Sequence, residues 1–291
     1  MNSPKERIIK IFFSMNGIFV IFVLVAILVL LASRSIPFFQ EIGLKAFFTD
    51  QFWNPTSYVS NTYGIRTMVV GTLIVTGLSL LFAIPVGVGC AAYLAEVAAP
   101  RTREVLKPFL EILAGIPSVV IGFFGLVVLN PIISRMFNLT HGLTALNGGI
   151  LLAIMALPTI ISISEDAIYA VPLEYKEASL ALGASRWQTL VKVTLPAAKS
   201  GVIASTMLGM GRAIGETMTV LMVTGNVRAM PSSILDPVMT MTATIAIEMG
   251  EVPYNTTHYY ALFALGLVLF LMTFLVNLTS DLILNKKKGG T

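Results

Sequence analysis

Six long apolar stretches in a chain of 291 residues constrain its fold more than any other feature. Each is close to the length of about 20 apolar residues that an α-helix needs to cross a bilayer. Only 12% of the residues are charged, about half the usual share of a soluble domain. The sequence therefore predicts an all-α polytopic membrane protein with a single domain over residues 1–291. We place its six transmembrane helices near residues 11–32, 67–95, 107–129, 148–170, 200–224 and 259–284.

The basic residues are distributed unevenly around these stretches. Thirteen of the 19 Lys and Arg residues lie in the two termini and in the loops after the second and fourth stretches. Lys and Arg are enriched in cytoplasmic loops, and an even number of spans puts both ends of the chain on one side. We therefore expect a multi-pass protein of the cell inner (plasma) membrane with both termini in the cytoplasm. The net charge of +4 then reflects topology, and no nucleic-acid partner is expected.

The few reactive side chains argue against metal and enzyme chemistry. Cys90 is the single cysteine, and His141 and His258 are far apart in the sequence, so we expect no metal site and no cofactor. An intramembrane enzyme would need paired acids or a nucleophile and base at matched depth, and neither pattern is present. No Gly-x-x-x-x-Gly-Lys-Ser/Thr motif occurs, so any ATPase acting with this chain would be a separate subunit.

Arg212 and Glu216 lie about midway along the fifth apolar stretch. A charge there costs at least about 2.5 kcal/mol by insertion scales, and Arg cannot lose its proton. Four residues of separation place both side chains on one face of a continuous helix, and Gly211 and Gly215 would let another helix approach. Two interpretations remain open at this level. The pair either fixes helix register or forms a solute site whose guanidinium binds an oxyanion.

Pro117, two residues after Gly115 in the third stretch, belongs to a wider set of glycines and prolines in the apolar stretches. Small residues favour close helix packing and proline bends helices. We interpret Gly211, Gly215 and Pro117 as helix-packing or gating positions. The long outer loop at 225–258 also holds a Thr-rich, fairly apolar stretch at 236–249, which is compatible with a short re-entrant or interfacial helix.

The predicted cytoplasmic loop at 171–199 has a helix-turn-helix pattern. Residues 173–182 are good helix formers, Gly183 would end that helix, and Ser185 would cap the next one. The second helix is amphipathic, with Trp187 and neighbouring aliphatic residues, and Pro196 limits it before the fifth stretch. The pattern alone allows either an interfacial helix or a docking helix for a cytoplasmic partner.

The same loop resembles the EAA loop of ABC importer permeases. That pattern is Glu-Ala-Ala, three residues, Gly, nine residues, an aliphatic residue, any residue, then Leu-Pro. Ser179 replaces the second Ala, and Val193 replaces Ile. The resemblance implies the type I ABC importer (MetI-like) permease fold and a coupling element that seats in a groove of a separate ATPase. Its fixed positions would be Glu177 at the ATPase, Gly183 at the turn and Pro196 at the exit, together with Ala178, Val193 and Leu195.

Residues 211–217 resemble the arginine-glutamate segment of phosphate importer permeases, and so do residues 113–125 and 157–167. Residues 218–226 and 52–55 are more similar to the PstC-type subunit than to PstA. The resemblance implies a permease subunit for phosphate with Arg212, Glu216 and Thr217 on the substrate path. It also implies a PstA-like second subunit, two ATPase copies, an extracytoplasmic phosphate-binding protein and surrounding membrane lipid. The alternatives are a PstA-type subunit or another oxyanion, such as molybdate or sulfate.

Overall fold

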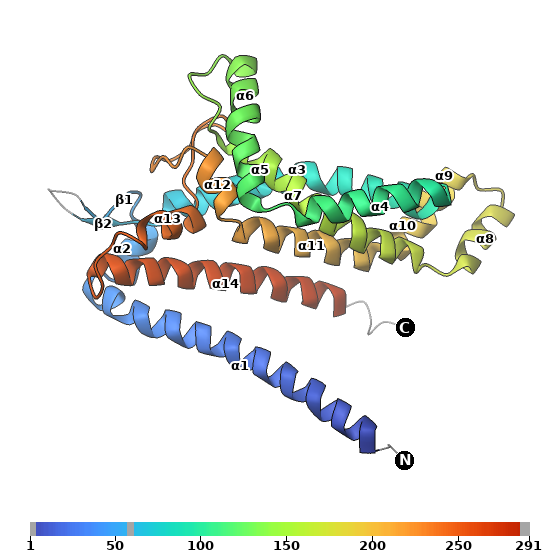
Figure 1. Ribbon diagram of the computed structural model, residues 1–291, viewed down its shortest axis with the longest axis horizontal. Helices are drawn as coiled ribbons and strands as arrows, with labels where there is room; N and C mark the ends of the chain where they lie inside the picture. Colours follow the sequence, from blue (N-terminus) through green and yellow to red (C-terminus); the bar gives the residue numbers. More distant parts are fainter. Residues whose placement is uncertain (1–3, 57–60, 286–291) are drawn as a thin grey trace.

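A computed structural model describes residues 4–56 and 61–285, and most of these residues are helical (Figure 1). In this part of the chain a short antiparallel ribbon joins β1 (Trp53–Asn54) and β2 (Thr62–Tyr63), with Trp53 opposite Tyr63. Two π-helical turns occur, at Gly125–Leu129 and Leu190–Thr194. The other elements are α1 (Pro4–Glu41), α2 (Leu44–Thr49), β1 (Trp53–Asn54), β2 (Thr62–Tyr63), α3 (Arg66–Glu96), α4 (Pro100–Gly115), α5 (Ser118–Phe124), α6 (Asn130–Phe137), α7 (Ala145–Tyr169), α8 (Leu173–Ala181), α9 (Arg186–Thr189), α10 (Leu195–Ala197), α11 (Lys199–Gly215), α12 (Met218–Val223), α13 (Met241–Glu248) and α14 (Thr257–Asn285).

Five helices in the described part of the chain are long and apolar enough to cross a membrane. Four of them, within α1, α3, α7 and α14, fall where the sequence places the first, second, fourth and sixth spans. The remaining one begins at Ser118, inside the predicted third span, and the fifth apolar stretch contains no helix of that length. The candidate spans are Ile9–Glu41, Arg66–Glu96, Ser118–Phe137, Ala145–Tyr169 and Thr257–Thr279.

The centre of the bundle is α7, which packs against α3 on one side and α11 on another. Small residues let these helices approach closely. A side chain on Gly87 would meet Ile160, and one on Gly149 would meet Leu78. Ile160 is fully buried, so this contact leaves no room for a larger residue. Close packing therefore fixes the position of α3 relative to α7.

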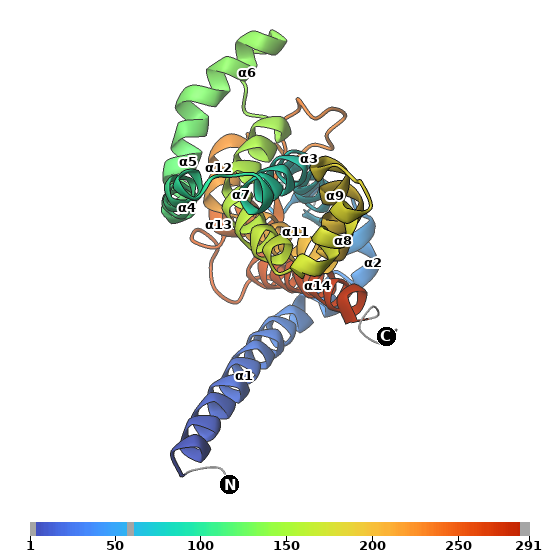
Figure 2. The same ribbon diagram turned by 90° about the vertical axis from the view of Figure 1, so that its right-hand side faces the viewer.

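The predicted third span at 107–129 is wrong as one continuous helix, because the chain breaks at Ile116 and Pro117. Ile116 is extended (φ −67°, ψ 126°), since the residue before a proline is disfavoured in the helical conformation. Pro117 is extended as well (φ −58°, ψ 138°). In Figure 1 α4 runs along the bundle, whereas the chain turns sharply after it and α6 projects away from the bundle in both views (Figures 1 and 2).

The predicted fifth span at 200–224 is also wrong as one helix. The first part, α11, ends at Gly215, and Glu216 is extended (φ −70°, ψ 131°) before α12 begins at Met218. The backbone carbonyl of Glu216 accepts a hydrogen bond from Thr242 Oγ1 at 2.8 Å. A partner from α13, the short helix expected in the outer loop, therefore stabilises this break.

The two ends of the bundle carry different elements. The helices α2 and α13 and the β-ribbon gather at one end (Figure 1). At the other end lie α8 and α9, and the first residues of α1 and the last residues of α14 point the same way (Figure 1). In both views α1 diverges from the bundle, and its side chains from Ile9 to Leu30 are largely exposed. Which end faces the cytoplasm stays a prediction.

Candidate functional site

Arg212 lies in the last turn of α11, and its side chain is exposed in the isolated chain. Among residues 4–56 and 61–285, its guanidinium has no hydrogen-bond or ion-pair partner. A permanently charged guanidinium inside a membrane bundle needs an anion, water or another chain. The position therefore suits reception of an anionic group.

Glu216 does not pair with Arg212, so the expectation of two charges on one continuous helical face is wrong. Because α11 ends at Gly215, the carboxylate of Glu216 points along the next helix instead. Its Oε1 accepts a hydrogen bond from the Thr219 N–H, at 3.3 Å, as an N-terminal cap does. The hydroxyl of the next residue, Thr217, donates to the Gly215 carbonyl at 3.3 Å. Glu216 and Thr217 thus shape the break beside Arg212.

The break at Glu216 lies next to the break at Pro117. The hydroxyl of Thr219, in α12, donates to the backbone carbonyl of Ser118, at the start of α5, with a distance of 3.1 Å. Gly122 allows the close approach, because a Cβ there would lie 2.8 Å from Met222 Sδ. Irregular backbone is tolerated within membrane bundles where it is buried in protein or lines a water-filled cavity. Two adjacent breaks and one unpaired Arg212 therefore form the candidate site.

The predicted packing role of Gly211 and Gly215 does not match their surroundings. A Cβ on Gly211 would lie 3.7 Å from Asn277 Oδ1 in α14, which is ordinary contact, and a Cβ on Gly215 would have nothing within 4 Å. Neither residue creates a close helix contact between described residues. Gly215 instead precedes the break.

Close packing of α11 depends on a different set of small residues, Gly201, Ser205 and Gly209. A Cβ on Gly201 would clash with the Ala167 Cβ of α7, and a Cβ on Gly209 would lie 2.8 Å from Ile160 Cγ1. The Ser205 hydroxyl bonds to the Ser164 hydroxyl at 2.6 Å. Spacing of four residues was the signal that could have identified this stripe.

The turn in the 171–199 loop follows the sequence closely. Gly183 has a φ of +84°, a conformation that glycine adopts without steric cost. Its N–H donates to Leu180 O at 2.9 Å, and the Ala184 N–H donates to Ser179 O at 3.2 Å. These two bonds form a Schellman motif that ends α8. Ser185 then caps α9 in a capping box with Gln188, as expected.

Ser179, one of the two departures from the EAA pattern, connects the two helices of this loop. Its hydroxyl lies 3.0 Å from the Thr189 hydroxyl. Pro196 lies in α10, directly before α11. Val193 and Leu195 are half-buried and Ala178 is exposed. The predicted coupling positions thus belong to one compact helix-turn-helix joined to α11.

The tip of the loop presents an exposed surface of mixed chemistry. Leu182 is 90% exposed and Trp187 is 70% exposed. Glu177 is exposed, and its carboxylate has no hydrogen bond or ion pair with any residue that the structure describes. Large apolar side chains beside an available charge are typical of a protein interaction surface.

Glu165, near the same end of the bundle, holds α4 against α7. Its carboxylate is buried and pairs with Arg103 Nη2 at 2.6 Å and Lys107 Nζ at 3.2 Å. The Arg103 guanidinium also lies over the Tyr169 ring, 4.9 Å from its centroid. Glu165 therefore anchors α4 to α7.

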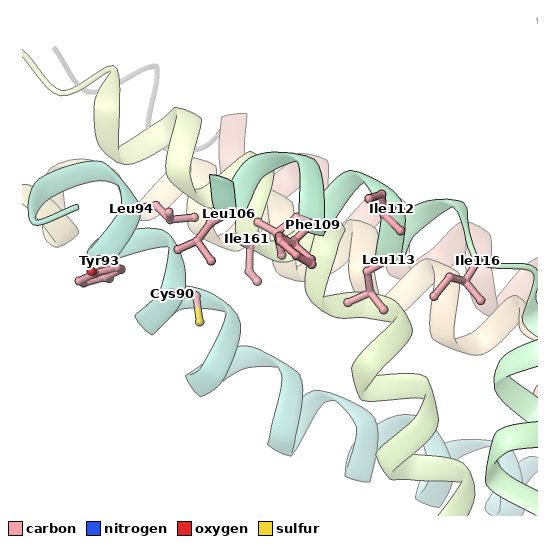
Figure 3. Close-up of a pocket in the computed structure, with 10 residues that line it drawn as sticks. Cys90, Tyr93, Leu94, Leu106, Phe109, Ile112, Leu113, Ile116 and Ile161 are labelled. Atoms are coloured by element: carbon pink, nitrogen blue, oxygen red, sulfur yellow. The ribbon is translucent and has the colours of Figure 1, made fainter. Parts of the chain in front are cut away.

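An apolar cavity of about 410 Å³ lies between α3, α4 and α7. Figure 3 shows side chains from these helices around it, including Cys90, Tyr93, Phe109 and Leu113. Its lining contains no charged residue, so nothing there offsets the desolvation of an oxyanion. The cavity is therefore not the anion site, and its surface suits apolar chains.

Tyr63 and Asp236, which lie outside the candidate spans, have shifted pKa values. Hydrogen bonds from the Ser232 N–H, the Ser232 hydroxyl and the Ser233 N–H lower the pKa of Asp236. Burial raises the pKa of Tyr63. At neutral pH the Asp236 carboxylate is therefore charged and the Tyr63 phenol is neutral.

Comparison with known proteins places this arrangement among membrane transport components. Residues 83–288 match the family model described as "Binding-protein-dependent transport system inner membrane component". A probable ABC transporter permease protein of Bacillus subtilis, YqgH, is 41% identical over 91% of this chain and 86% of its own length. The phosphate transport system permease protein PstC of Pasteurella multocida is 34% identical over 99% of this chain and 96% of its own length.

Solved structures show the same fold. A chain of a bacterial ABC transporter involved in the import of the acidic polysaccharide alginate aligns with a TM-score of 0.65 and 17% identity, covering 95% of both chains. A chain of the MetNI methionine ABC transporter, in an inward-facing conformation, aligns with a TM-score of 0.58 and 19% identity, covering 76% of this chain and 96% of its own. At these identities the likeness concerns the fold.

Proposed function

Because this chain belongs to the family of binding-protein-dependent transport system inner membrane components, we propose that it is a PstC-type permease subunit of an ATP-driven phosphate importer. The observation that carries the proposal is the unpaired Arg212 beside two helix breaks. Curated PstC proteins at 34% and 35% identity support the choice of phosphate. The relative at 41% identity carries no substrate in its name, so the substrate needs its own test.

Arg212 is suited to phosphate because a planar guanidinium can donate two parallel hydrogen bonds to two oxygens of one anion. Glu216, held by Thr219 and Thr242, keeps its negative charge off the guanidinium. The anion therefore does not have to displace an internal ion pair. Thr217, half-buried at the same break, offers a hydroxyl to the same path.

The coupling loop and Arg212 belong to one helical run. Pro196 lies in α10, and α11 follows it to Gly215. At a rise of about 1.5 Å per residue, α11 spans roughly 25 Å. A displacement of the loop by the ATPase therefore reaches Arg212 through a rigid element. We assign Glu177 and the exposed tip around Trp187 to the ATPase contact.

The proposed assembly contains this chain, a PstA-like second permease subunit, an ATPase dimer and an extracytoplasmic phosphate-binding protein. Large apolar surfaces on α1 and α5, including Phe19, Phe22, Phe123 and Phe124, are exposed in the isolated chain. Lipid and the second permease subunit would cover them. The chain supplies half of an alternating-access path, and ATP hydrolysis takes place on the separate ATPase.

The test is phosphate uptake by the complete importer in liposomes, with the binding protein outside and ATP supplied to the ATPase. Arg212→Ala should lower uptake at least tenfold, because losing a charged hydrogen-bond partner costs about 1.5–3 kcal/mol. Arg135→Ala, which removes an exposed arginine from α6, is the matched control and should not change uptake.

Uptake by Arg212→Ala equal to wild type, with the complex assembled, would refute the path assignment. Sulfate or molybdate as the preferred substrate of the wild-type complex would replace phosphate and leave the permease assignment intact.

A further inference from the structure

The short helix α13 ends at a buried carboxylate that gathers three outer segments. Glu248 is 5% exposed. Its carboxylate accepts hydrogen bonds from Trp53 Nε1 at 2.9 Å and Arg228 Nη2 at 2.7 Å, and it lies 2.7 Å from His258 Nε2. Trp53 belongs to the β-ribbon, Arg228 follows α12, and His258 lies in the first turn of α14. A buried carboxylate needs such partners, so these segments are held together through Glu248.

The other end of α13 is fixed to the transport site. Thr242 Oγ1 donates to the Glu216 carbonyl at 2.8 Å, at the break next to Arg212. The Met241 N–H donates to Thr72 Oγ1 in α3 at 3.1 Å. Met241, Thr242, Ala243 and Thr244 are all buried. The first turn of α13 is therefore held in place as firmly as its last residue.

The helix between these ends is short and regular. Eight residues at about 1.5 Å each give a strut of roughly 12 Å. Figure 1 shows α13 between the β-ribbon and α12. Because both ends are hydrogen-bonded, the outer segments cannot shift as a unit without moving the Glu216 carbonyl or breaking buried bonds.

We propose that α13 transmits docking of the loaded binding protein from the outer segments to the break at Glu216, with Glu248 as the positioning residue. This inference rests on the proposed function and adds a regulatory role for a residue outside the substrate path. The outer segments receive the binding protein, Glu248 moves with them, and Thr242 moves the Glu216 carbonyl. ATP hydrolysis then responds to the docked partner.

The test is the stimulation ratio of the complete reconstituted importer. This ratio is the ATPase rate with phosphate-loaded binding protein divided by the rate without it. Glu248→Gln keeps an acceptor for Trp53 but loses the charge that holds Arg228. We expect the ratio to fall about fivefold or more, the usual scale of coupling between two sites, with an unchanged basal rate. Glu251→Gln, at an exposed residue of the same loop, should keep the wild-type ratio.

A second pair of variants separates transmission from general packing. Thr242→Val removes the hydroxyl but keeps nearly the same side-chain shape, and it should lower the stimulation ratio. Thr242→Ser keeps the hydroxyl donor and should have the wild-type ratio. Thr206→Val removes a half-buried hydroxyl bonded within α11 and should leave the ratio unchanged. Thr242 and Glu248 are about 9 Å apart along the helix, so independent effects should add. If α13 transmits the signal as one unit, the double variant Glu248→Gln/Thr242→Val should lose no more of the stimulation ratio than the more impaired single variant.

Three results would overturn the proposal: an unchanged ratio in Glu248→Gln, an unchanged ratio in Thr242→Val, or additive losses in the double variant. If Glu248→Gln does not assemble, Thr242→Val and Thr242→Ser decide by themselves. A wild-type complex that phosphate-loaded binding protein does not stimulate would count against the proposed function instead.

Discussion

Gly183 determines the geometry of the coupling loop at the scale of one residue. Its φ of +84° turns the chain after α8 and places Ser185 where it can cap α9. An L-residue with a Cβ pays about 1–2 kcal/mol in this conformation. No atom lies within 4 Å of the position that such a Cβ would take. The backbone conformation alone therefore favours glycine there.

Gly183→Ala should weaken binding of the ATPase to the permease by about 5- to 30-fold, the equivalent of 1–2 kcal/mol. Gly183→Asn should lose less, because Asn tolerates the left-handed region better. Binding of the purified ATPase to the permease pair in nanodiscs measures both. Gly89→Ala, in α3 with open space around it, is the control. Wild-type affinity in Gly183→Ala would contradict the assigned role.

Local signals explain which single residues could be predicted. Gly183 and Ser185 act on their immediate neighbours, so the sequence places both correctly. The extended conformation of Glu216 depends on Thr242, a residue 26 positions further along the chain. A helical pattern that continues through Glu216 gives no sign of that partner. The unpaired state of Arg212 follows from the same distant contact.

Helix packing at the scale of elements depends on which face of α11 carries small residues. Gly201 and Gly209 face α7, whereas Gly215 faces open space. Spacing alone favours each pair equally, because Gly211 with Gly215 and Gly201 with Ser205 are both four residues apart. The orientation of α11 against α7 decides, and only the folded bundle contains that information.

Gly201→Ala should destabilise the protein by about 1–3 kcal/mol, since its new methyl group overlaps with the Ala167 Cβ in a packed interface. Gly215→Ala should be neutral or slightly stabilising, because Ala is the better helix former and meets no neighbour. The midpoints of thermal unfolding of the two variants, measured in the same detergent, test this prediction. A lower midpoint for Gly215→Ala than for Gly201→Ala would show that the predicted stripe, rather than the observed one, packs the bundle.

The apolar segments show which features of the helices can be predicted from the sequence. The long apolar stretches in α3, α7 and α14 each form one continuous helix, and their predicted bounds lie close to those observed. The third and fifth stretches are also long and mainly apolar, but they contain Pro117 and Glu216. Hydropathy over a window averages such positions away, so it gives the apolar length and not the interruption.

The whole molecule has two chemically different ends, and the basic residues predict which one faces the cytoplasm. The coupling loop and the outer loop of α13 lie at opposite ends (Figure 1). Cys90 is the single cysteine. A Cys90→Ser background therefore allows one reporter thiol at a time to be introduced at an exposed position.

Glu177→Cys should react with a membrane-impermeant maleimide only in inside-out vesicles, and Glu251→Cys only in right-side-out vesicles. Both native residues are exposed, so accessibility differs by side of the membrane rather than by burial. Labelling after detergent solubilisation is the control for thiol reactivity. The reverse pattern would invert the predicted topology.

The hydrogen bond from Thr219 to the Ser118 carbonyl has a consequence for how the molecule can bend. Because it joins the two interruptions, α4 and α11 lie on one side of a shared hinge, and α5 and α12 lie on the other. Two separate hinges would let each helix pair swing alone and leave a leak between them. With the bond in place, a bend at one interruption displaces the other, so we expect the two helix pairs to move about one hinge rather than independently.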